Sequence, residues 1–497
     1  MKTEKATIGQ LQMQGDPPKI INNSIPIIIT GWDSPDARRF RQDYARFNSL
    51  PFNGTALKLR VDADIIFPFQ GTFSSQSWDS RWFTPAIRDL QAVARDESRK
   101  LKYNLLLVNA NPGDVDWFDD SAWREVEKHF EIAADVARQG GLKGIIFDPE
   151  PYTPPHAQFE YSQHPSSATH SYAETKLKAR ERGKQVWSAF FQRFPNATVL
   201  FYFALSGVER IRLANGTFKT LQGHWYDLFP SFLDGCLDVA PPDAFLIDGN
   251  EGAYLYNSHA EYTNAANRIR HENLSLISPE NRKKYRKLFR VGQAFYLDAY
   301  INPPSDDYYI DGLGRPRVER LEENLKSALE TADGVIWIYG ESHRWWREGG
   351  PANARYWDEA LPGCLEAIRR AVEPERIVTE SLRNLPNRVQ NSECLNTDGW
   401  AQWQRDDSQG TFSWDERGYR NPGSLKTTAM RSGCWYQEVP VTPRSLVGFR
   451  AWRRVEGQAE AYVYLRWKTR DGTWTAIDRD RGFTAEPSPQ WQPIMGL

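Results

Sequence analysis

The sequence predicts an α/β fold: a (β/α)8 barrel followed by a smaller all-β sandwich domain. Eight apolar runs of strand length recur between residues 25 and 376, and amphipathic stretches lie between them. The runs are almost continuously apolar, as in a parallel sheet that is buried on both faces. After about residue 377 the pattern changes to short alternating runs separated by turn residues, which is typical of antiparallel sheets.

The predicted strands and helices alternate along the first part of the chain. The eight runs span residues 26–33, 55–62, 103–111, 144–150, 198–207, 243–251, 289–298 and 334–341. After the first run, Ser34-Pro35-Asp36 offers a helix N-cap and a proline at the first helical position. The stretch 121–141 has helical apolar spacing and stops at Gly140-Gly141. Eight such units in about 350 residues fit a barrel, and the lack of a glycine-rich phosphate loop disfavours an open doubly wound sheet.

The predicted domain boundaries follow from the change of pattern. We expect an N-terminal extension over 1–24, the barrel over 25–376, a linker over 377–390 and the β domain over 391–497. In the β domain, residues 434–441, 445–455 and 460–468 read as strands. Asp471-Gly472 then predicts a hairpin turn before a further strand at 473–477.

The composition limits the classes of function. The net charge of −2 argues against a nucleic-acid or membrane-surface partner, and no stretch approaches the roughly 18 apolar residues of a membrane span. Residues 1–19 lack an apolar signal core, so localisation is left open between cytoplasmic and, if a signal peptide has been removed, secreted or periplasmic. The four cysteines lack metal-ligand spacing, and nothing indicates the oligomeric state.

Acidic, amide and aromatic side chains gather at the ends of the eight runs, where a barrel carries its chemistry. Aromatic residues make up 13% of the chain, and their flat apolar faces suit sugar rings. The resulting set predicts acid/base chemistry on a neutral, polyhydroxylated ligand. Besides Asp62, its members are Trp32, Asp33, Asn109, Asp148, Glu150, Tyr152, Asp248, Glu251, Asp298, Trp337, Tyr339, Glu341 and Trp345.

Two pairs of carboxylates carry the catalytic hypothesis. Asp148 and Glu150 are two residues apart and would share a face of a strand, so each would raise the cost of ionising the other. We expect a raised pKa at Glu150, as a general acid needs, although a capping Asp148 with an arginine-paired Glu150 is the structural alternative. Two strands later, Asp248 and Glu251 form a second pair of candidate carboxylates. The structural alternative is that Asp248-Gly249 is a plain turn and that Glu251 is incidental.

The remaining candidates would bind substrate rather than react. Trp337, Tyr339 and Glu341 share a face by the period of two, and a tryptophan in a barrel mouth suits a sugar ring, although a core position is the alternative. We predict no cofactor and no metal. A hard cation held by the four carboxylates named above is the chemical rival, and zinc is disfavoured because no pair of histidines is placed to bind it.

This layout resembles the (β/α)8 glycoside hydrolases, although it assigns no single family. The Asp-x-Glu that closes the fourth run is similar to that of chitinase-type enzymes, which use the glutamate as the acid. Two earlier aspartates of that motif would fall at Lys143 and Ile146, which argues against amino-sugar substrates and the substrate-assisted mechanism. Families that pair a fourth-strand acid with a sixth-strand acid fit equally well.

The tail is similar to carbohydrate-binding β-sandwich modules, through Gly399-Trp400, Trp403, Gln437 and Pro443, and it is shorter than complete modules of that kind. The resemblances imply a glycosidase that cleaves O-glycosidic bonds of an oligo- or polysaccharide. Glu150 would be the acid, Asp148 its tuning partner, and Glu251 or Asp248 the nucleophile or base. The rivals are a non-catalytic sugar-binding barrel and a polysaccharide lyase.

Overall fold

The computed structural model describes residues 25–61, 68–152, 157–208, 220–373, 382, 385–443, 445, 447–457, 459, 461–476, 480–484 and 488–496. The predicted extension 1–24, Asp62 and much of the predicted linker lie outside the described residues. Two compact units divide between Val372 and Glu373. Each unit is described by itself.

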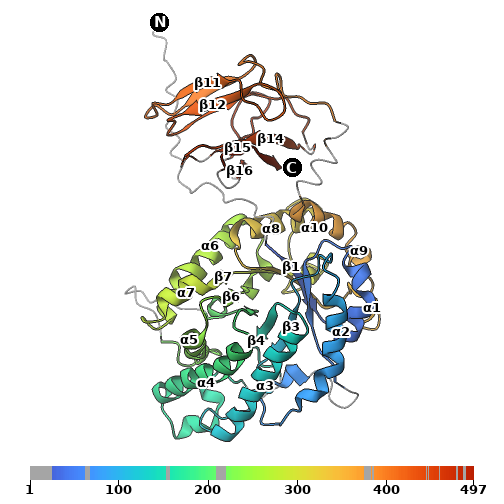
Figure 1. Ribbon diagram of the computed structural model, residues 1–497, viewed down its shortest axis with the longest axis vertical. Coiled ribbons are helices and arrows are strands. Elements are labelled where there is room, and N and C mark those ends of the chain that lie inside the picture. The colour runs from blue at the N-terminus through green and yellow to red at the C-terminus, as the bar shows by residue number, and fades with distance from the viewer. Residues whose placement is uncertain are drawn as a thin grey trace. The chain divides into compact units, whose positions relative to one another are not determined.

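The first unit is a barrel of parallel strands surrounded by helices (Figure 1). Its described strands are β1 (Ile27–Gly31), β2 (Gly54–Leu57), β3 (Leu105–Asn109), β4 (Gly144–Asp148), β5 (Thr198–Phe201), β6 (Phe245–Asp248), β7 (Phe289–Val291), β8 (Gln293–Tyr296) and β9 (Ile336–Gly340). Their order in the sheet is β7-β6-β5-β4-β3-β2-β1-β9-β8. Every pair in this sheet is parallel, as the continuous apolar runs predicted.

One apolar run closes the barrel. The predicted strand 289–298 divides at Gly292, so that β7 pairs with β6 while β8 pairs with β9. Gly292 donates its backbone N–H to the Asp248 carbonyl at 2.8 Å, and a Cβ on it would lie 3.0 Å from Ile247 Cγ2. Among the described residues, the nine strand segments therefore correspond to the eight predicted runs, and the predicted (β/α)8 fold is confirmed.

The helices lie outside the strands. Those that the structure describes are α1 (Ala37–Phe47), α2 (Thr84–Ala94), α3 (Asp120–Gln139), α4 (Tyr172–Arg193), α5 (Phe229–Val239), α6 (His259–Arg270), α7 (Arg282–Leu288), α8 (Arg317–Thr331), α9 (Trp357–Ala360) and α10 (Cys364–Val372). None of these described helices is long and apolar enough to cross a membrane. The predicted stop of α3 at Gly140 is confirmed. The predicted start of α1 needs correction: Asp36 is the N-cap, because its carboxylate reaches the Arg39 N–H at 2.9 Å.

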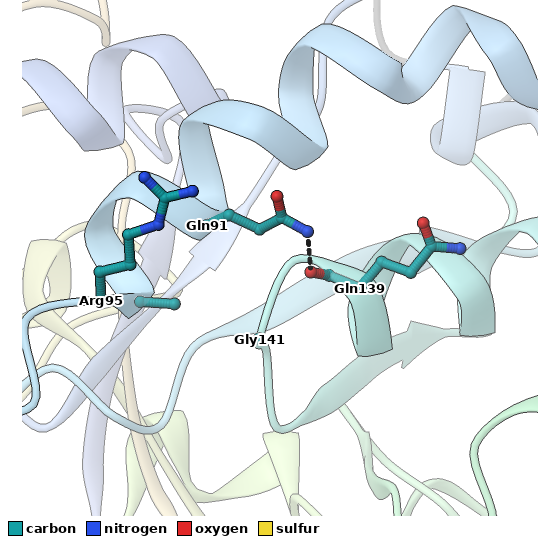
Figure 2. Close-up of a pocket in the computed structure, with 5 residues that line it drawn as sticks. Gln91, Arg95, Gln139 and Gly141 are labelled. Carbon is teal, nitrogen blue, oxygen red and sulfur yellow. Dashed lines mark hydrogen bonds between the residues drawn. The ribbon is translucent and has the colours of Figure 1, made fainter.

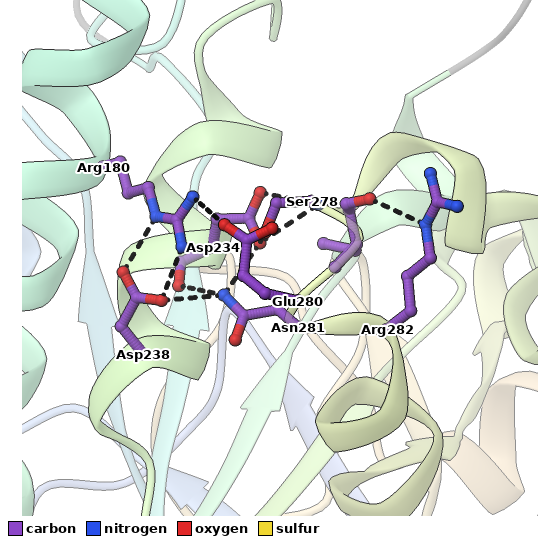
Figure 3. Close-up of polar contacts among 8 residues, drawn as sticks. Arg180, Asp234, Asp238, Ser278, Glu280, Asn281 and Arg282 are labelled. Atoms are coloured by element: carbon purple, nitrogen blue, oxygen red, sulfur yellow. Dashed lines mark hydrogen bonds and ion pairs between the residues drawn. The ribbon is translucent and has the colours of Figure 1, made fainter.

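A network of charged and polar groups joins helices α4 and α5 to the segment before α7 (Figure 3). Arg180 of α4 donates two hydrogen bonds to Asp238 of α5, at 2.8 and 2.7 Å, and a third to Glu280 at 2.8 Å. The Asn281 amide contacts both Asp234 and Asp238, at 3.0 and 2.8 Å. A bidentate arginine–carboxylate pair is geometrically specific, so this network holds the outer helices in register.

The aromatic core anchors the strand that carries the first catalytic candidates. Phe147 is fully buried and packs against Trp187 and Phe201, with ring centroids 5.8 and 5.7 Å apart. Because side chains alternate along a strand, the next residue, Asp148, points to the other face, into the barrel. Core packing on one side of β4 therefore fixes the position of the carboxyl group on the other.

The second unit contains short antiparallel pairs. Its described strands are β10 (Ala401–Gln404), β11 (Thr411–Asp415), β12 (Ser424–Thr428), β13 (Gly433–Tyr436), β14 (Phe449–Arg453), β15 (Tyr462–Leu465), β16 (Arg481–Thr484) and β17 (Gln492–Gly496). They pair as β10-β13, β11-β12, β14-β17 and β15-β16. These pairs confirm an antiparallel β domain, and its completion into a sandwich stays a prediction.

The barrel should fold without the second unit, because its described core cluster lies between Ile25 and Ala371. We expect a chain that ends at residue 385 to stay soluble and to melt within a few degrees of the full-length protein. Circular dichroism and thermal unfolding measure this. Aggregation of the shortened chain, or a melting temperature lowered by ten degrees or more, would mean that the second unit covers part of the barrel's apolar surface.

Candidate active site

The carboxyl ends of the parallel strands bring the candidate acids to one end of the barrel. Asp148 closes β4, Asp248 closes β6, and Glu341 directly follows β9. Glu150 and Glu251 stand just beyond the ends of β4 and β6. The sequence prediction that these acids share one end of the barrel therefore agrees with the strand order.

Asp148 and Glu150 are joined through the hydroxyl group of Tyr152. The Tyr152 hydroxyl oxygen lies 2.9 Å from Asp148 Oδ2 and 2.6 Å from Glu150 Oε2. Asp148 also accepts the Glu150 backbone N–H at 3.0 Å and the side-chain amide of Asn109 at 2.7 Å. The predicted pair is thus a hydrogen-bonded group of two carboxyls and one phenol, with Asn109 as a positioning partner.

Asn111 holds the backbone of this group. Its Nδ2 donates to the Glu150 carbonyl oxygen at 3.0 Å, and its Oδ1 accepts the Tyr152 N–H at 2.9 Å. The segment after β4 is therefore fixed to the segment after β3 by one side chain. Neither an arginine partner for Glu150 nor a helix capped by Asp148 occurs among the described contacts.

Burial makes Asp148 the member of the pair that keeps a proton. Desolvation, with a further contribution from the Glu150 charge, raises the pKa of Asp148 to about 8. The sequence predicts that Glu150 holds the proton of the pair. The structure favours it on Asp148, which is 1% exposed, while Glu150 is partly open to solvent.

Glu251 lies near this pair and interacts with it electrostatically. It starts the 3-10 helix η6 (Glu251–Leu255) after Asn250, which has a left-handed backbone with φ of 49°. Burial and then the charges of Glu150 and Asp148 raise the pKa of Glu251 well above its usual value. Three carboxyl groups thus share a poorly solvated volume in which full ionisation is costly.

Asp248 is fully buried and occupied by structural hydrogen bonds. It accepts backbone N–H groups from Ala204 at 3.1 Å, Ser206 at 2.9 Å and Asn250 at 3.3 Å, together with the Ser206 hydroxyl. These donors hold the loop after β5. Of the two sixth-strand candidates left open by the sequence, the geometry therefore favours Glu251 for chemistry.

Asp33 and Asp298 use their carboxylates in the same way. Asp298 accepts the Glu341 N–H at 2.9 Å and the next backbone N–H at 3.0 Å. Asp33 accepts the N–H groups of Trp345 and Trp346, and burial raises its pKa to about 6. Both aspartates hold the loop after β9, so they act as positioning residues and not as ligand contacts.

Glu341 and Lys58 are two further charged groups at this end. Burial, followed by the charge of Asp298, raises the pKa of Glu341, which is hydrogen-bonded to Tyr296. Lys58 follows β2, and burial lowers its pKa against the opposing effect of Asp33 and other acids. Sequence reasoning missed Lys58, although a lysine inside the apolar run 55–62 is an available signal.

The aromatic candidates divide into exposed and buried rings. Trp32 and Tyr152 are 56% and 57% exposed, and Trp32 is hydrogen-bonded to the partly buried Tyr339. Trp337 has no exposed surface: it stacks on Tyr202 with centroids 4.4 Å apart, and its Nε1–H donates to a backbone carbonyl at 2.8 Å. Trp345 is 2% exposed, so both of these tryptophans belong to the packed interior and not to a binding surface.

Two further tyrosines interact electrostatically with the acids, and the sequence did not predict them as site residues. Burial and the charges of Glu150, Asp148 and Glu251 raise the pKa of Tyr226. Tyr308 is 47% exposed, and the same two glutamates raise its pKa after burial. Both stand in loops without strand periodicity, so no sequence signal identified them.

The described surface also has a hollow of about 270 Å³ away from the acids (Figure 2). Gln91, Arg95, Gln139 and Gly141 line it, and Gln91 Nε2 donates to the Gln139 carbonyl at 3.0 Å. It lies beside the carboxyl ends of α2 and α3, which alternate with the strands and so end at the opposite side of the barrel. Among the described residues, no cluster of three or more His, Cys, Asp or Glu side chains has the geometry of a metal site.

No protein-family model matches the chain, and no curated protein sequence matches it. Solved structures similar to it include a GH5 subfamily 4 broad-specificity endoglucanase from Clostridium longisporum, with a TM-score of 0.35 and 7% identity over 72% of this chain and 99% of that chain. A glucosidase from Croceicoccus marinus has a TM-score of 0.38 and 9% identity over 72% and 69%. A GH5 subfamily 4 protein in complex with a cellotriose has a TM-score of 0.36 and 10% identity over 71% and 96%.

The raised pKa of Asp148 predicts how stability changes with pH. The folded state keeps a proton that the unfolded state releases near its ordinary pKa of 3.8, so Asp148 opposes folding increasingly from about pH 4 to about pH 8. Asp148→Asn removes this penalty. Its melting temperature, relative to wild type, should rise by a few degrees between pH 5 and pH 9. Exposed Asp243→Asn is the control, and a flat difference for Asp148→Asn would mean that Asp148 is ionised in the folded protein.

The two kinds of acid should respond differently to substitution. Asp248→Ala leaves several buried donors without an acceptor and should cost on the order of 3 kcal/mol of unfolding free energy. Glu251→Gln replaces a poorly solvated carboxyl group by an amide of the same shape and should leave stability equal or higher. Denaturant unfolding of both variants measures this. Equal losses of unfolding free energy would contradict the different roles of Asp248, which holds the loop after β5, and Glu251, which does not.

Proposed function

We propose that the barrel is a glycoside hydrolase that cleaves O-glycosidic bonds of an oligo- or polysaccharide. One observation carries this proposal: Asp148, Glu150 and Glu251 meet at the carboxyl end of the barrel, where burial and mutual repulsion favour keeping a proton among them. Glycoside hydrolysis needs one carboxyl group that donates a proton and a second that acts as base or nucleophile.

In the proposed reaction Glu150 protonates the oxygen of the leaving sugar as the bond to the anomeric carbon breaks. Glu251 acts from the neighbouring side, either on that carbon or on the water that attacks it. A carboxylate with a raised pKa is a stronger base than an exposed one, which suits Glu251. Asp148 lies behind Glu150 and supports it, as developed below.

The proposed substrate is a neutral sugar chain. Three acids converge on the site, and a charged sugar acid would add a further negative charge to them. Trp32, Tyr152 and Tyr308 are exposed enough to present ring faces to a sugar. Glu341, fixed at its backbone by Asp298, is suited to accept hydrogen bonds from sugar hydroxyl groups.

We also propose that the second unit binds carbohydrate. Exposed aromatic rings occur on several of its strands and loops, including Trp403 on β10, Trp414 on β11 and Trp474. Sugar-binding surfaces need such rings. Loss of polymer binding, with unchanged cleavage of short soluble oligosaccharides, is the behaviour expected of the chain shortened at residue 385.

A panel of neutral and acidic polysaccharides, with products analysed by mass, tests the activity. We expect neutral chains to give fragments that have gained one water per cleavage. Glu150→Gln and Glu251→Gln should each lower the rate by roughly 10²–10⁴. Glu272→Gln, at an exposed glutamate that begins the 3-10 helix η7 (Glu272–Leu276) after α6, is the matched control and should match wild type. Unsaturated product ends would indicate a lyase, and binding without products would indicate a non-catalytic barrel.

Aryl glycosides with good leaving groups separate the two roles. A substrate that needs little protonation should retain much of its rate in Glu150→Gln and lose it in Glu251→Gln. The reverse pattern would exchange the two roles, and wild-type rates in both variants would remove both residues from the mechanism.

A further inference from the structure

The Tyr152 hydroxyl makes more short contacts to carboxyl oxygens than its single proton can serve. Its oxygen lies 2.9 Å from Asp148 Oδ2 and 2.6 Å from Glu150 Oε2. A phenol donates one hydrogen bond, and an ionised carboxylate can only accept. With both acids ionised, at least one of these contacts would lack its own proton.

A proton on one of the carboxyl groups completes both hydrogen bonds. Asp148 is the favoured holder because it is buried, and its Oδ2–H then donates to the Tyr152 oxygen while Tyr152 donates to Glu150. In the alternative, both acids are ionised and the phenol proton alone is shared between them. The buried Asp148 carboxylate would then be charged beside the charged Glu150 carboxylate, and burial opposes this state. Asn111 holds the backbone of Tyr152, because its Oδ1 accepts the Tyr152 N–H at 2.9 Å.

We propose that Tyr152 is a proton bridge that lets Asp148 and Glu150 hold one proton in common. Tyr152 acts through these carboxyl groups and is therefore a positioning residue. Transfer along the bridge moves the Asp148 proton to the Tyr152 oxygen as the Tyr152 proton passes to Glu150 Oε2. Asp148 becomes the anion, Glu150 becomes the acid, and Tyr152 stays neutral throughout.

The catalytic consequence of the bridge rests on the proposed hydrolase function. Transfer along the bridge moves the shared proton from Asp148 to Glu150, and Glu150 then gives that proton to the leaving oxygen, which leaves both carboxyl groups ionised. A buried carboxyl group thus serves as the proton store for a more exposed one, whose oxygen can face the substrate. The shared proton itself does not depend on the reaction and can be measured without a substrate.

Other ionisable groups face the bridge from neighbouring elements and will move both steps of its titration. Their effect on the titration is the same in wild type and in a variant that changes only the Tyr152 phenol. These groups include Lys58 after β2, Tyr202 after β5, Tyr226 before α5, Glu251 and Tyr254 in η6, Tyr308 after η8 (Leu297–Tyr300), and Tyr339 in β9.

Carboxyl titration of Tyr152→Phe tests the bridge. The full chain, labelled with ¹³C at aspartate and glutamate carboxyl carbons, is titrated by NMR, with Asp148 and Glu150 assigned from Asp148→Asn and Glu150→Gln. A bridge stabilises the state with one proton, so wild type should titrate in two well-separated steps. Tyr152→Phe should raise the lower apparent pKa and lower the upper one, each by on the order of one unit.

The direction of the two shifts separates the alternatives. If Tyr152 is a simple donor to carboxylates, its loss raises both values, and if its role is only packing, neither value moves; either result overturns the proposal. Tyr44→Phe is the matched control, because the Tyr44 hydroxyl donates to the single carboxylate Asp96 at 3.2 Å. On a cleaved substrate, both limbs of the pH–rate profile should move inward in Tyr152→Phe. If the two apparent carboxyl pKa values move toward each other in Tyr152→Phe but the protein cleaves no substrate, the proposed bridge stands and the proposed hydrolase function fails.

Discussion

Closure of the parallel sheet is the constraint on which the rest of this site depends. The run 289–298 pairs with β6 through its first half and with β9 through its second, so the strands form a ring. In a ring, every strand end points to the same small volume. Acids that stand at the ends of β4, β6 and β9 must then either find donors for their charge or keep a proton.

Both solutions occur, and side-chain length separates them. The aspartates that close or follow strands, Asp33, Asp248 and Asp298, are short enough to accept backbone N–H groups of adjacent loops, and so they fix those loops. Glu150 and Glu251 stand one or more residues later and extend beyond this layer. Asp33, Asp248 and Asp298 thus fix the loops at this end of the barrel, while Glu150 and Glu251, together with Asp148, are available for chemistry.

The sequence was sufficient for the fold and for part of the site. Continuous apolar runs require a sheet covered on both faces, and so the strands and their acidic ends could be predicted. The division between clamping and free acids could not, because it depends on which backbone donors the neighbouring loops present. The same limit applies to Trp337. The alternation of side chains along its strand predicts which face of the sheet it lies on, but only the structure shows that the Tyr202 ring covers the indole. Tyr226 joins the site through tertiary proximity alone, whereas Lys58 has a sequence signal as a lysine inside the apolar run 55–62.

The two prolines on either side of Glu150 explain why the segment after Asp148 leaves the sheet. Pro149 and Pro151 lack an N–H group, so they cannot donate to a sheet ladder, and β4 ends at Asp148. The Glu150 N–H is the only backbone donor among these three residues, and it returns to Asp148 Oδ1. The segment therefore takes its shape from side chains, with Asn111 on one side and the carboxyl of Asp148 on the other. An Asp-Pro-Glu-Pro-Tyr sequence at the end of a buried strand thus brings two carboxyl groups and a phenol together, in a backbone that cannot relax into a longer strand and separate them.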